Sequence, residues 1–156
     1  MAEVAPYSPR QEAVGNAVIR VMSRVQAVLY RASGGRVGGR FLRGARVGIL
    51  SHTGRRTGEL HRTPLIYVDW GDAVVVAASK GGFSGHPAWY YNVTANPEVS
   101  FQAGREDVPR RARRATVAER PDLWARLDRE YRDFATYRER AAAQGREIAL
   151  FVLEPR

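Results

Sequence analysis

The fold is decided by residues 47–78, VGILSHTGRRTGELHRTPLIYVDWGDAVVVAA, in which turn signals separate three largely apolar runs. The runs are Val47–Ser51, Thr63–Trp70 and Ala73–Ala78, and we expect each to be a strand. Glycines bracket the turn between the first two, and Gly71-Asp72 is a hairpin signal between the second and third. Consecutive strands joined by tight turns favour an antiparallel sheet or barrel over alternating βαβ units.

The chain after residue 78 extends this pattern with helices and further strands. A short helix is predicted for Pro87–Ala95, and Asn96-Pro97 ends it. A later helix is predicted to open near Thr116–Glu119, which has capping-box spacing, and to stop at Gly145. Its apolar stripe is Leu123, Leu127, Tyr131, Phe134 and Tyr137. The remaining strands are expected at Val99–Ala103, Val108–Val117 and Ile148–Leu153.

The N-terminal part is predicted to be separate from this sheet. Residues 1–10 are expected to be a loose tail, Gln11–Ala32 a helix, and Ser33–Gly39 a glycine-rich hinge. The helix has an apolar stripe of valines and Leu29, with Arg20, Arg24 and Arg31 on the other side. Two interpretations are open: the stripe packs on the core, or the helix lies on an anionic membrane. We therefore divide the chain into residues 1–39 and a domain of residues 40–156.

Composition excludes several kinds of protein. The chain has 156 residues, 44% of them hydrophobic, which suits one ordinary folded domain. It has no cysteine, so thiol nucleophiles and thiolate metal sites are excluded. Its three histidines show no metal-binding spacing, and no GxSxG motif is present, so we expect no metal site and no serine hydrolase. The chemistry must come from a bound ligand or a cofactor.

The positive charge predicts an anionic ligand. The formal net charge is +9, and of the 25 basic residues only Lys80 is a lysine. Two basic turns follow strands beside glycines: Gly54–Gly58, with Arg55 and Arg56, and Ser79–Gly82, with Lys80. Guanidinium groups, a lysine and uncovered backbone N–H groups suit a phosphate or carboxylate. The nearby aromatic cluster Trp89-Tyr90-Tyr91 suggests that this anion carries a flat ring.

Four motifs together resemble one known family. They are TGRRTG at 53–58 followed by TPL at 63–65, AASKGG at 77–82, HPAWYYN at 86–92, and ANP at 95–97. In order and spacing they are similar to the deazaflavin-dependent nitroreductases, small actinobacterial oxidoreductases that use reduced coenzyme F420, several of which reduce quinones. The resemblance runs from about Val47 to the C-terminus. It implies an α+β fold: an FMN-binding-like antiparallel split β-barrel with an N-terminal helix and helices packed on the barrel.

The resemblance also implies roles for particular residues. Arg55, Arg56 and Lys80 would hold the phosphate and oligoglutamate tail of F420, and Trp89 and Asn92 would wall its ring pocket. His61 stands where many members have arginine. Tyr131, Phe134 and Tyr137 would cover the substrate, with Tyr131 and Tyr137 as candidate proton donors. The full set implied for cofactor binding is Thr53, Gly54, Arg55, Arg56, Thr57, His61, Thr63, Pro64, Ala77, Ala78, Ser79, Lys80, Gly81, Gly82, Trp89 and Asn92.

The implied function is hydride transfer from reduced F420 to an electron-poor acceptor, a quinone or a nitro compound. A cytoplasmic protein is expected, with contact between the first helix and the inner face of an anionic membrane as a further expectation. Two alternatives stay open: an FMN- or heme-binding protein on the same barrel, and a basic nucleic-acid-binding module. Arg110, Arg111, Arg113 and Arg114 favour the second, but no nucleic-acid-binding motif accompanies them, so we expect no nucleic-acid partner.

Overall fold

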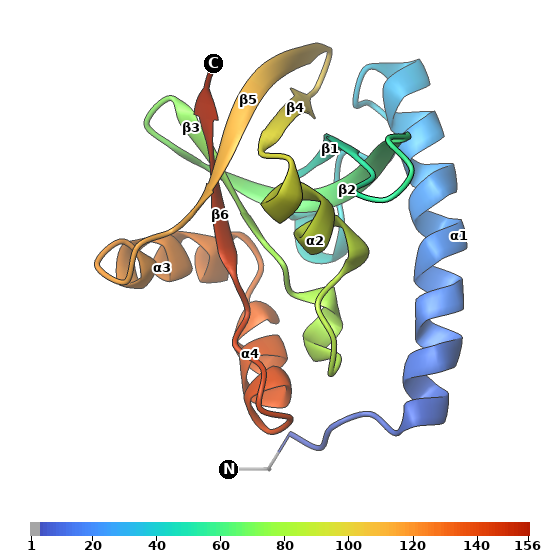
Figure 1. The fold of residues 1–156 in the computed structure, drawn as a ribbon, viewed down its shortest axis with the longest axis vertical. Coiled ribbons are helices and arrows are strands. Elements are labelled where there is room, and N and C mark those ends of the chain that lie inside the picture. The colour runs from blue at the N-terminus through green and yellow to red at the C-terminus, as the bar shows by residue number, and fades with distance from the viewer. Residues whose placement is uncertain (1–3) are drawn as a thin grey trace.

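A computed structural model describes residues 4–156, and its centre is a closed six-stranded antiparallel barrel with strand order β1-β2-β3-β6-β5-β4 (Figure 1). Strand β4 pairs with β1 and closes the barrel. The strands are β1 (Val47–Thr53), β2 (Leu60–Trp70), β3 (Ala73–Ala77), β4 (Glu98–Ala103), β5 (Glu106–Arg114) and β6 (Leu150–Pro155). The helices are α1 (Pro9–Ser33), α2 (Ala88–Ala95), α3 (Arg120–Glu130) and α4 (Phe134–Ala142), with short 3₁₀ turns η1 (Leu42–Gly44) and η2 (Lys80–Gly82). The expected antiparallel barrel is confirmed.

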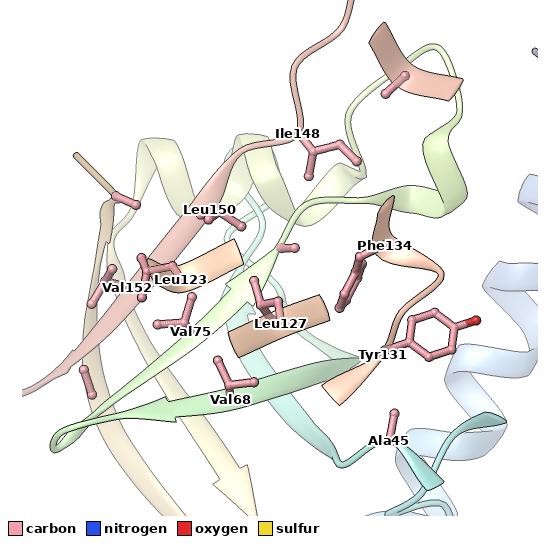
Figure 2. Packing of buried hydrophobic residues seen from close by; sticks show 14 residues of the cluster. Ala45, Val68, Val75, Leu123, Leu127, Tyr131, Phe134, Ile148, Leu150 and Val152 are labelled. Atoms are coloured by element: carbon pink, nitrogen blue, oxygen red, sulfur yellow. The ribbon is translucent and has the colours of Figure 1, made fainter. Parts of the chain in front are cut away.

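The apolar run in β3 is buried on both faces of the sheet. Val74 and Val76 point into the barrel, where they pack with Phe101 and Phe151. Val75 and Ala77 point outward, where α3 and α4 cover them with Leu123, Leu127 and Phe134 (Figure 2). The helices therefore explain why this strand is continuously apolar instead of alternating.

The late helical segment is two helices, so the prediction of one continuous helix was wrong. Helix α3 ends at Glu130 and α4 begins at Phe134. Tyr131 between them has an extended backbone, with φ −149° and ψ 99°. This break turns the Tyr131 ring so that it packs edge-on against Phe134 and Phe41. Periodicity alone does not detect the break because the apolar spacing continues across it.

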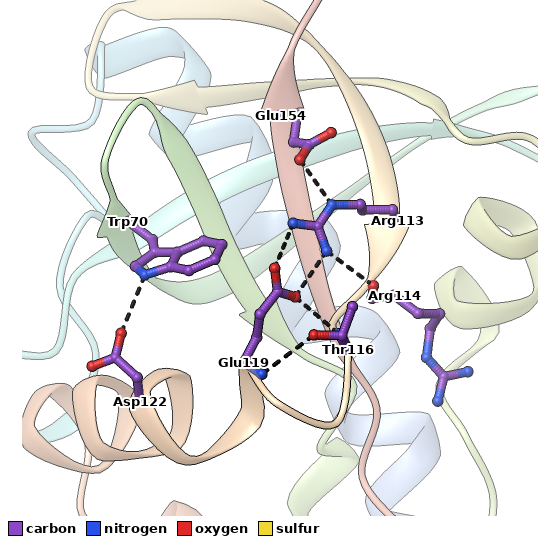
Figure 3. A network of polar contacts seen from close by, with 7 residues as sticks. All are labelled: Trp70, Arg113, Arg114, Thr116, Glu119, Asp122 and Glu154. Carbon is purple, nitrogen blue, oxygen red and sulfur yellow. Dashed lines mark hydrogen bonds and ion pairs between the residues drawn. The ribbon is translucent and has the colours of Figure 1, made fainter.

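Strand β5 ends earlier than predicted, at Arg114, because a polar network starts the turn into α3 (Figure 3). Glu119 Oε2 accepts from the backbone N–H of Thr116 at 2.8 Å, and the backbone N–H of Glu119 contacts Thr116 Oγ1 at 3.3 Å. Arg113 pairs with Glu119 at 2.9 Å and with Glu154 of β6 at 2.8 Å. Arg113, and then this backbone N–H, lower the pKa of Glu119 to about 2. The capping-box contacts thus occur in the turn immediately before α3.

Helix α1 lies along one side of the barrel (Figure 1) and packs against Ile49 of β1 through Ala27 and Tyr30. Tyr30 is buried, and its hydroxyl accepts from the backbone N–H of Gly104 at 2.7 Å. Gly15 lies so close to Phe83 that a Cβ there would meet the ring at 2.8 Å. The Ser8–Gln11 capping box starts the helix, so the loose tail predicted for residues 1–10 ends before Pro9, and its first three residues lie outside the described part.

The valine stripe of α1 faces away from the barrel, so the interpretation that it packs on the core was wrong. The side chains that face outward are between 45% and 66% exposed: Val14, Val18, Ile19, Val21, Met22, Val25, Val28 and Leu29. The face of α1 that meets the barrel instead carries Ala27 and Tyr30, which are buried against Ile49. Whether residues 1–39 form a separate unit stays a prediction.

Candidate functional site

The turn between β1 and β2 presents two arginines on a rigid backbone. The backbone N–H of Gly54 donates to Glu59 O at 2.7 Å, and that of Gly58 donates to Gly54 O at 2.9 Å. Gly58 has φ +72°, a conformation that favours glycine. Arg55 and Arg56 are both exposed. The turn therefore fixes the backbone of both arginines, while their guanidinium groups remain exposed and free to reach a ligand.

A relay of hydrogen bonds joins this turn to α2 and β2. The backbone N–H of Arg55 donates to Asn92 Oδ1 at 3.0 Å, so the Nδ2 group of Asn92 is the donor to His52 Nδ1 at 3.2 Å. His52 must then carry its proton on Nε2, which lies 3.0 Å from Thr63 Oγ1. Burial, and then the nearby His61, lower the pKa of His52 to about 4, which keeps the imidazole neutral.

The turn borders a cavity of about 260 Å³, which we call the Arg55 cavity. It is lined by Gly54, Arg55, Arg56, Thr57, His61, Ala88, Tyr91 and Asn92. The Arg55 guanidinium lies 5.1 Å from the centre of the Tyr91 ring. Within residues 4–156, no carboxylate forms an ion pair with Arg55 or Arg56. The cavity therefore fits an anionic group, because its positive charge has no internal partner.

The second basic turn, Ser79–Gly82, follows β3. Side chains from other parts of the chain hold it in place by hydrogen bonds to its backbone carbonyl groups. Arg146 donates to the carbonyl oxygens of Phe83, Ala78 and Ser79 at 2.8, 3.0 and 2.7 Å. Arg140 and Gln144 donate to the carbonyls of Gly81 and Gly82 at 3.0 and 3.1 Å. On the other side, Glu12 of α1 accepts from the backbone N–H and the hydroxyl of Ser84. The turn is thus clamped between α4 and α1.

Lys80 lies in this clamped turn and does not line the Arg55 cavity. Its backbone has φ +45°, an unusual conformation for a residue with a side chain. Burial lowers the pKa of the Lys80 amine, and the carboxylate of Glu12 opposes that change. The structure brings Arg55, Arg56, Thr57, His61 and Asn92 together at one cavity. A joint role for Lys80 stays a prediction.

Several of the other residues expected at the site belong to the protein core. Ala77 and Ala78 are buried, and Trp89 is 4% exposed and packs edge-on against Phe151 inside the barrel. Tyr131 and Phe134 belong to the cluster under α3 and α4 (Figure 2). Thr53 lies in β1 and Pro64 lies in β2. Pro64 pairs with Ile49 of β1, and it lies outside the part of β2 that pairs with β3. Their roles at a cofactor are untested.

Of the three aromatic residues expected to cover the substrate, Tyr137 keeps partial exposure, whereas Tyr131 and Phe134 are buried. Its hydroxyl lies 3.2 Å from that of Tyr131. Burial, followed by this hydrogen bond, raises the pKa of Tyr131 well above its usual range. Tyr131 is therefore a poor proton donor, whereas the structure leaves Tyr137 half-buried.

Sequence reasoning missed two positioning residues, His52 and Arg146. His52 was considered only as a metal ligand, and no group of three or more acidic or histidine side chains in residues 4–156 could hold a metal ion. Side chains alternate between the two faces of a strand, and the place of His52 in this alternation within β1 was the signal that its side chain points inward. Arg146 belongs to no sequence motif. It follows Gly145 in a loop, and only the folding of the chain brings it to its hydrogen-bond partners.

The fold defines the class of the protein, a split β-barrel, and its basic cavity has the charge that suits an anionic ligand. A family model described as F420H(2)-dependent quinone reductase matches residues 22–155. The chain belongs to this family. The match begins inside α1, earlier than the resemblance at about Val47 that the sequence motifs indicated.

Individual relatives agree with the family match. An F420H(2)-dependent quinone reductase of Mycobacterium tuberculosis is 42% identical over 82 residues, which is 52% of this chain and 54% of that protein. A solved F420-H2 dependent reductase, FDR-A, is 35% identical with a TM-score of 0.63, over 69% of this chain and 93% of that one. A structure described as a domain-swapped dimer is 29% identical with a TM-score of 0.66, over 94% and 100%. The chain spans about half the length of the first curated relative.

Proposed function

We propose that this protein is an oxidoreductase that uses reduced F420 to reduce an electron-poor acceptor such as a quinone. The observation that carries the proposal is the Arg55 cavity, where two arginines without carboxylate partners meet on a fixed turn of a barrel of this family. F420 carries a phosphate and an oligoglutamate tail, which are the groups that such a cavity suits. The FMN, heme and nucleic-acid alternatives are less well supported because the family match names F420.

The chain's own residues would bind and orient this cofactor. Arg55 and Arg56 would grip the phosphate or tail carboxylates, and the relay from Asn92 through His52 to Thr63 would hold the Arg55 backbone in place. When bound, F420 supplies a hydride from its reduced deazaflavin ring. The remaining task of the protein is to fix the acceptor against that ring and to exclude water.

A proton must accompany the hydride when a quinone is reduced. Tyr137 is the better of the two tyrosine candidates because Tyr131 is 2% exposed and its pKa is raised. Tyr131 then acts on Tyr137 through their hydroxyl contact at 3.2 Å. In this proposal Tyr137 donates its proton to the reduced acceptor and recovers one from solvent. Phe134, which has no hydroxyl, packs the cluster beneath them.

The proposed activity is tested by oxidation of reduced F420 with a water-soluble quinone, followed by the absorbance of the oxidised cofactor. We expect turnover with reduced F420 and none with NADPH. Arg55→Gln and Arg56→Gln should each raise the Kd for F420 about tenfold or more, the size expected for one charge-assisted hydrogen bond. Arg36→Gln is the matched control, since Arg36 is exposed in the hinge and distant in sequence from the cavity. Turnover with NADPH alone would contradict the proposal.

We further propose that α1 places the protein at an anionic membrane surface. None of the helices in residues 4–156 has the length and apolar character needed to cross a membrane. The exposed stripe of α1 instead suits the interface, because apolar side chains enter the acyl region while cations remain near lipid phosphates. Arg20, Arg24 and Arg31, all exposed, lie along one border of the stripe at helical spacing. A lipid-soluble quinone would then reach the protein from the same surface.

Co-sedimentation with vesicles containing anionic lipid tests this placement. The triple variant Val18→Ser, Val21→Ser and Val25→Ser should lose vesicle binding and lose rate with long-tailed quinones more than with short ones. Val117→Ser is the control, because Val117 is 77% exposed outside α1. Binding should also fall with salt, since surface charges are screened over about 8–10 Å near physiological ionic strength. Self-association through the stripe, without vesicle binding, would contradict the membrane proposal.

A further inference from the structure

A second and larger cavity shares Tyr91 with the Arg55 cavity. Its volume is about 460 Å³, and we call it the Arg114 cavity. The residues that line it come from the loop before α2, from α2, from the end of β5, from the start of α3 and from the segment after α4. They are Ser84, Gly85, His86, Tyr90, Tyr91, Arg114, Arg120, Gln144, Gly145, Arg146 and Glu147. Tyr91 is the one residue that lines both cavities.

Positive charge in the Arg114 cavity exceeds negative charge. Arg120 forms an ion pair with Glu147, which neutralises one arginine. Arg146 is 7% exposed, its three hydrogen bonds go to uncharged carbonyl oxygens, and it forms no ion pair in the described residues; the carboxylate of Glu12 acts on it only from beyond ion-pair distance. Arg114 also forms no ion pair within residues 4–156. A buried charge whose counter-charge lies beyond ion-pair distance is unfavourable, and an anion in the cavity would supply a closer one.

Aromatic rings and one hydrogen bond position Arg114, which has no acidic partner among residues 4–156. Its guanidinium carbon lies 5.5 Å from the centre of the Tyr90 ring and 5.6 Å from that of Phe151, and its Nη1 donates to Tyr90 Oη at 3.1 Å. Figure 3 shows its side chain directed away from the network in which the neighbouring Arg113 binds Glu119 and Glu154. Two adjacent arginines of β5 thus have different roles: Arg113 is neutralised, and Arg114 remains available to a ligand.

His86 adds an unpartnered polar atom to the cavity. Its ring stacks on Tyr90 with centroids 4.0 Å apart and planes 9° apart. Its Nδ1 is buried and has no hydrogen-bond partner in the described chain. Burial, and then the charges of Arg146 and Arg114, lower the pKa of His86, which shows that both arginines act on this ring. A turn of the ring would bring this buried atom to a ligand oxygen in the cavity, which would satisfy it.

We propose that the Arg114 cavity binds a small oxyanion, a phosphate or carboxylate group, between Arg114, Arg146 and His86. The site goes beyond the proposed function, because it is separate from the Arg55 cavity and needs no F420 to form. The oxyanion has two sources that share this chemistry: a free small anion, or an acidic group at the far end of the cofactor tail that passes Tyr91.

Isothermal titration calorimetry of the 156-residue chain with inorganic phosphate and with citrate, at constant ionic strength, tests the proposal. Arg114→Gln should raise the Kd about ten- to a hundredfold, because one charge-assisted contact is lost. Gly85→Leu is the second variant: it keeps every charge, and a Cβ on Gly85 has no neighbour within 4 Å, so the added side chain has room to fill the cavity. Arg111→Gln is the matched control, since Arg111 lies on the same strand, is exposed and does not line the cavity.

The outcomes separate the proposal from nonspecific charge and from the proposed function. Weaker anion binding in Arg114→Gln and Gly85→Leu, with wild-type binding in Arg111→Gln, supports the site. Absence of binding in the wild type, or equal loss in Arg114→Gln and Arg111→Gln, overturns it. Titration with F420 of short and long glutamate tails then identifies the source. A loss in Arg114→Gln confined to the long tail assigns the oxyanion to the cofactor, and no loss with either tail assigns it to a free anion.

Discussion

The Nδ2 group of Asn92 on α2 lies 3.2 Å from Nδ1 of His52 on β1. This contact couples a helix to the strand that leads into the Arg55–Arg56 turn, and Asn92 completes the coupling by accepting from the Arg55 backbone N–H. Because His52 is neutral and its Nε2–H group faces Thr63, a single protonation state of the imidazole satisfies every hydrogen bond of the relay. The position of the basic turn therefore depends on an uncharged, buried histidine.

Protonation of His52 should make the protein less stable in acid. The pKa of His52 falls from 6.5 to about 4 on folding, so the unfolded chain binds more protons between these values. Its contribution is fully present above pH 6.5 and is lost as the pH falls toward 4, with a slope of at most about 1.4 kcal/mol per pH unit. Denaturant unfolding at pH 7, 6 and 5 measures this slope.

The control for this pH dependence is His52→Gln, which removes one titrating group but leaves His86. The variant should show a shallower loss of unfolding free energy between pH 7 and 5 than the wild type. Identical slopes in the two proteins would mean that other groups cause the acid sensitivity.

Lys80→Ala should raise the Kd for F420 about ten- to a hundredfold while changing kcat little. The lysine would contact a part of the cofactor that does not react, so binding before and during the reaction is weakened equally. Alanine suits the positive φ of this position no worse than lysine does, so the backbone cost is unchanged. Cofactor titration measures the effect, and Lys80→Arg should retain most of the affinity. An unchanged Kd in Lys80→Ala would place the lysine outside the site.

Gly82→Ala should destabilise the protein by about 2–4 kcal/mol. Gly82 has φ +77°, and a Cβ there would lie 2.6 Å from the carbonyl oxygen of Tyr137 on α4. The backbone strain and this close contact each lower the free energy of unfolding, and their effects add. Gly85→Ala is the matched control in the same loop, because a Cβ at Gly85 meets no atom within 4 Å. Thermal or denaturant unfolding compares the two, and equal stabilities would show that η2 can move away from α4.

Tyr137→Phe should lower kcat more than Tyr131→Phe does. Both substitutions remove the hydroxyl contact between the two rings, but only Tyr137 is exposed enough to meet an acceptor. Tyr131→Phe should instead reduce the unfolding free energy by about 1 kcal/mol, the usual contribution of one hydrogen bond. Steady-state rates with reduced F420 and a quinone, set beside unfolding curves, distinguish these roles. A larger rate loss in Tyr131→Phe at unchanged stability would reverse the assignment.

The sequence by itself determined the antiparallel barrel and the position of the Arg55–Arg56 turn. Both depend on local signals: apolar runs of strand length, and glycines that permit tight turns. The order and spacing of four short motifs were also enough to indicate the family, which the match over residues 22–155 confirmed.

Only the tertiary structure decided which faces and side chains meet. The valine stripe of α1 has core-like periodicity, yet the helix meets the barrel through the buried Tyr30, whose hydroxyl accepts from the Gly104 backbone N–H, while Gly15 lets it pass close to Phe83. The break at Tyr131 is invisible in the apolar spacing and depends on packing against Phe41. Arg146 reaches Ala78 and Ser79 across 68 and 67 residues of chain. Contacts between such distant residues are fixed by strand pairing and helix packing, which no local pattern of side chains encodes.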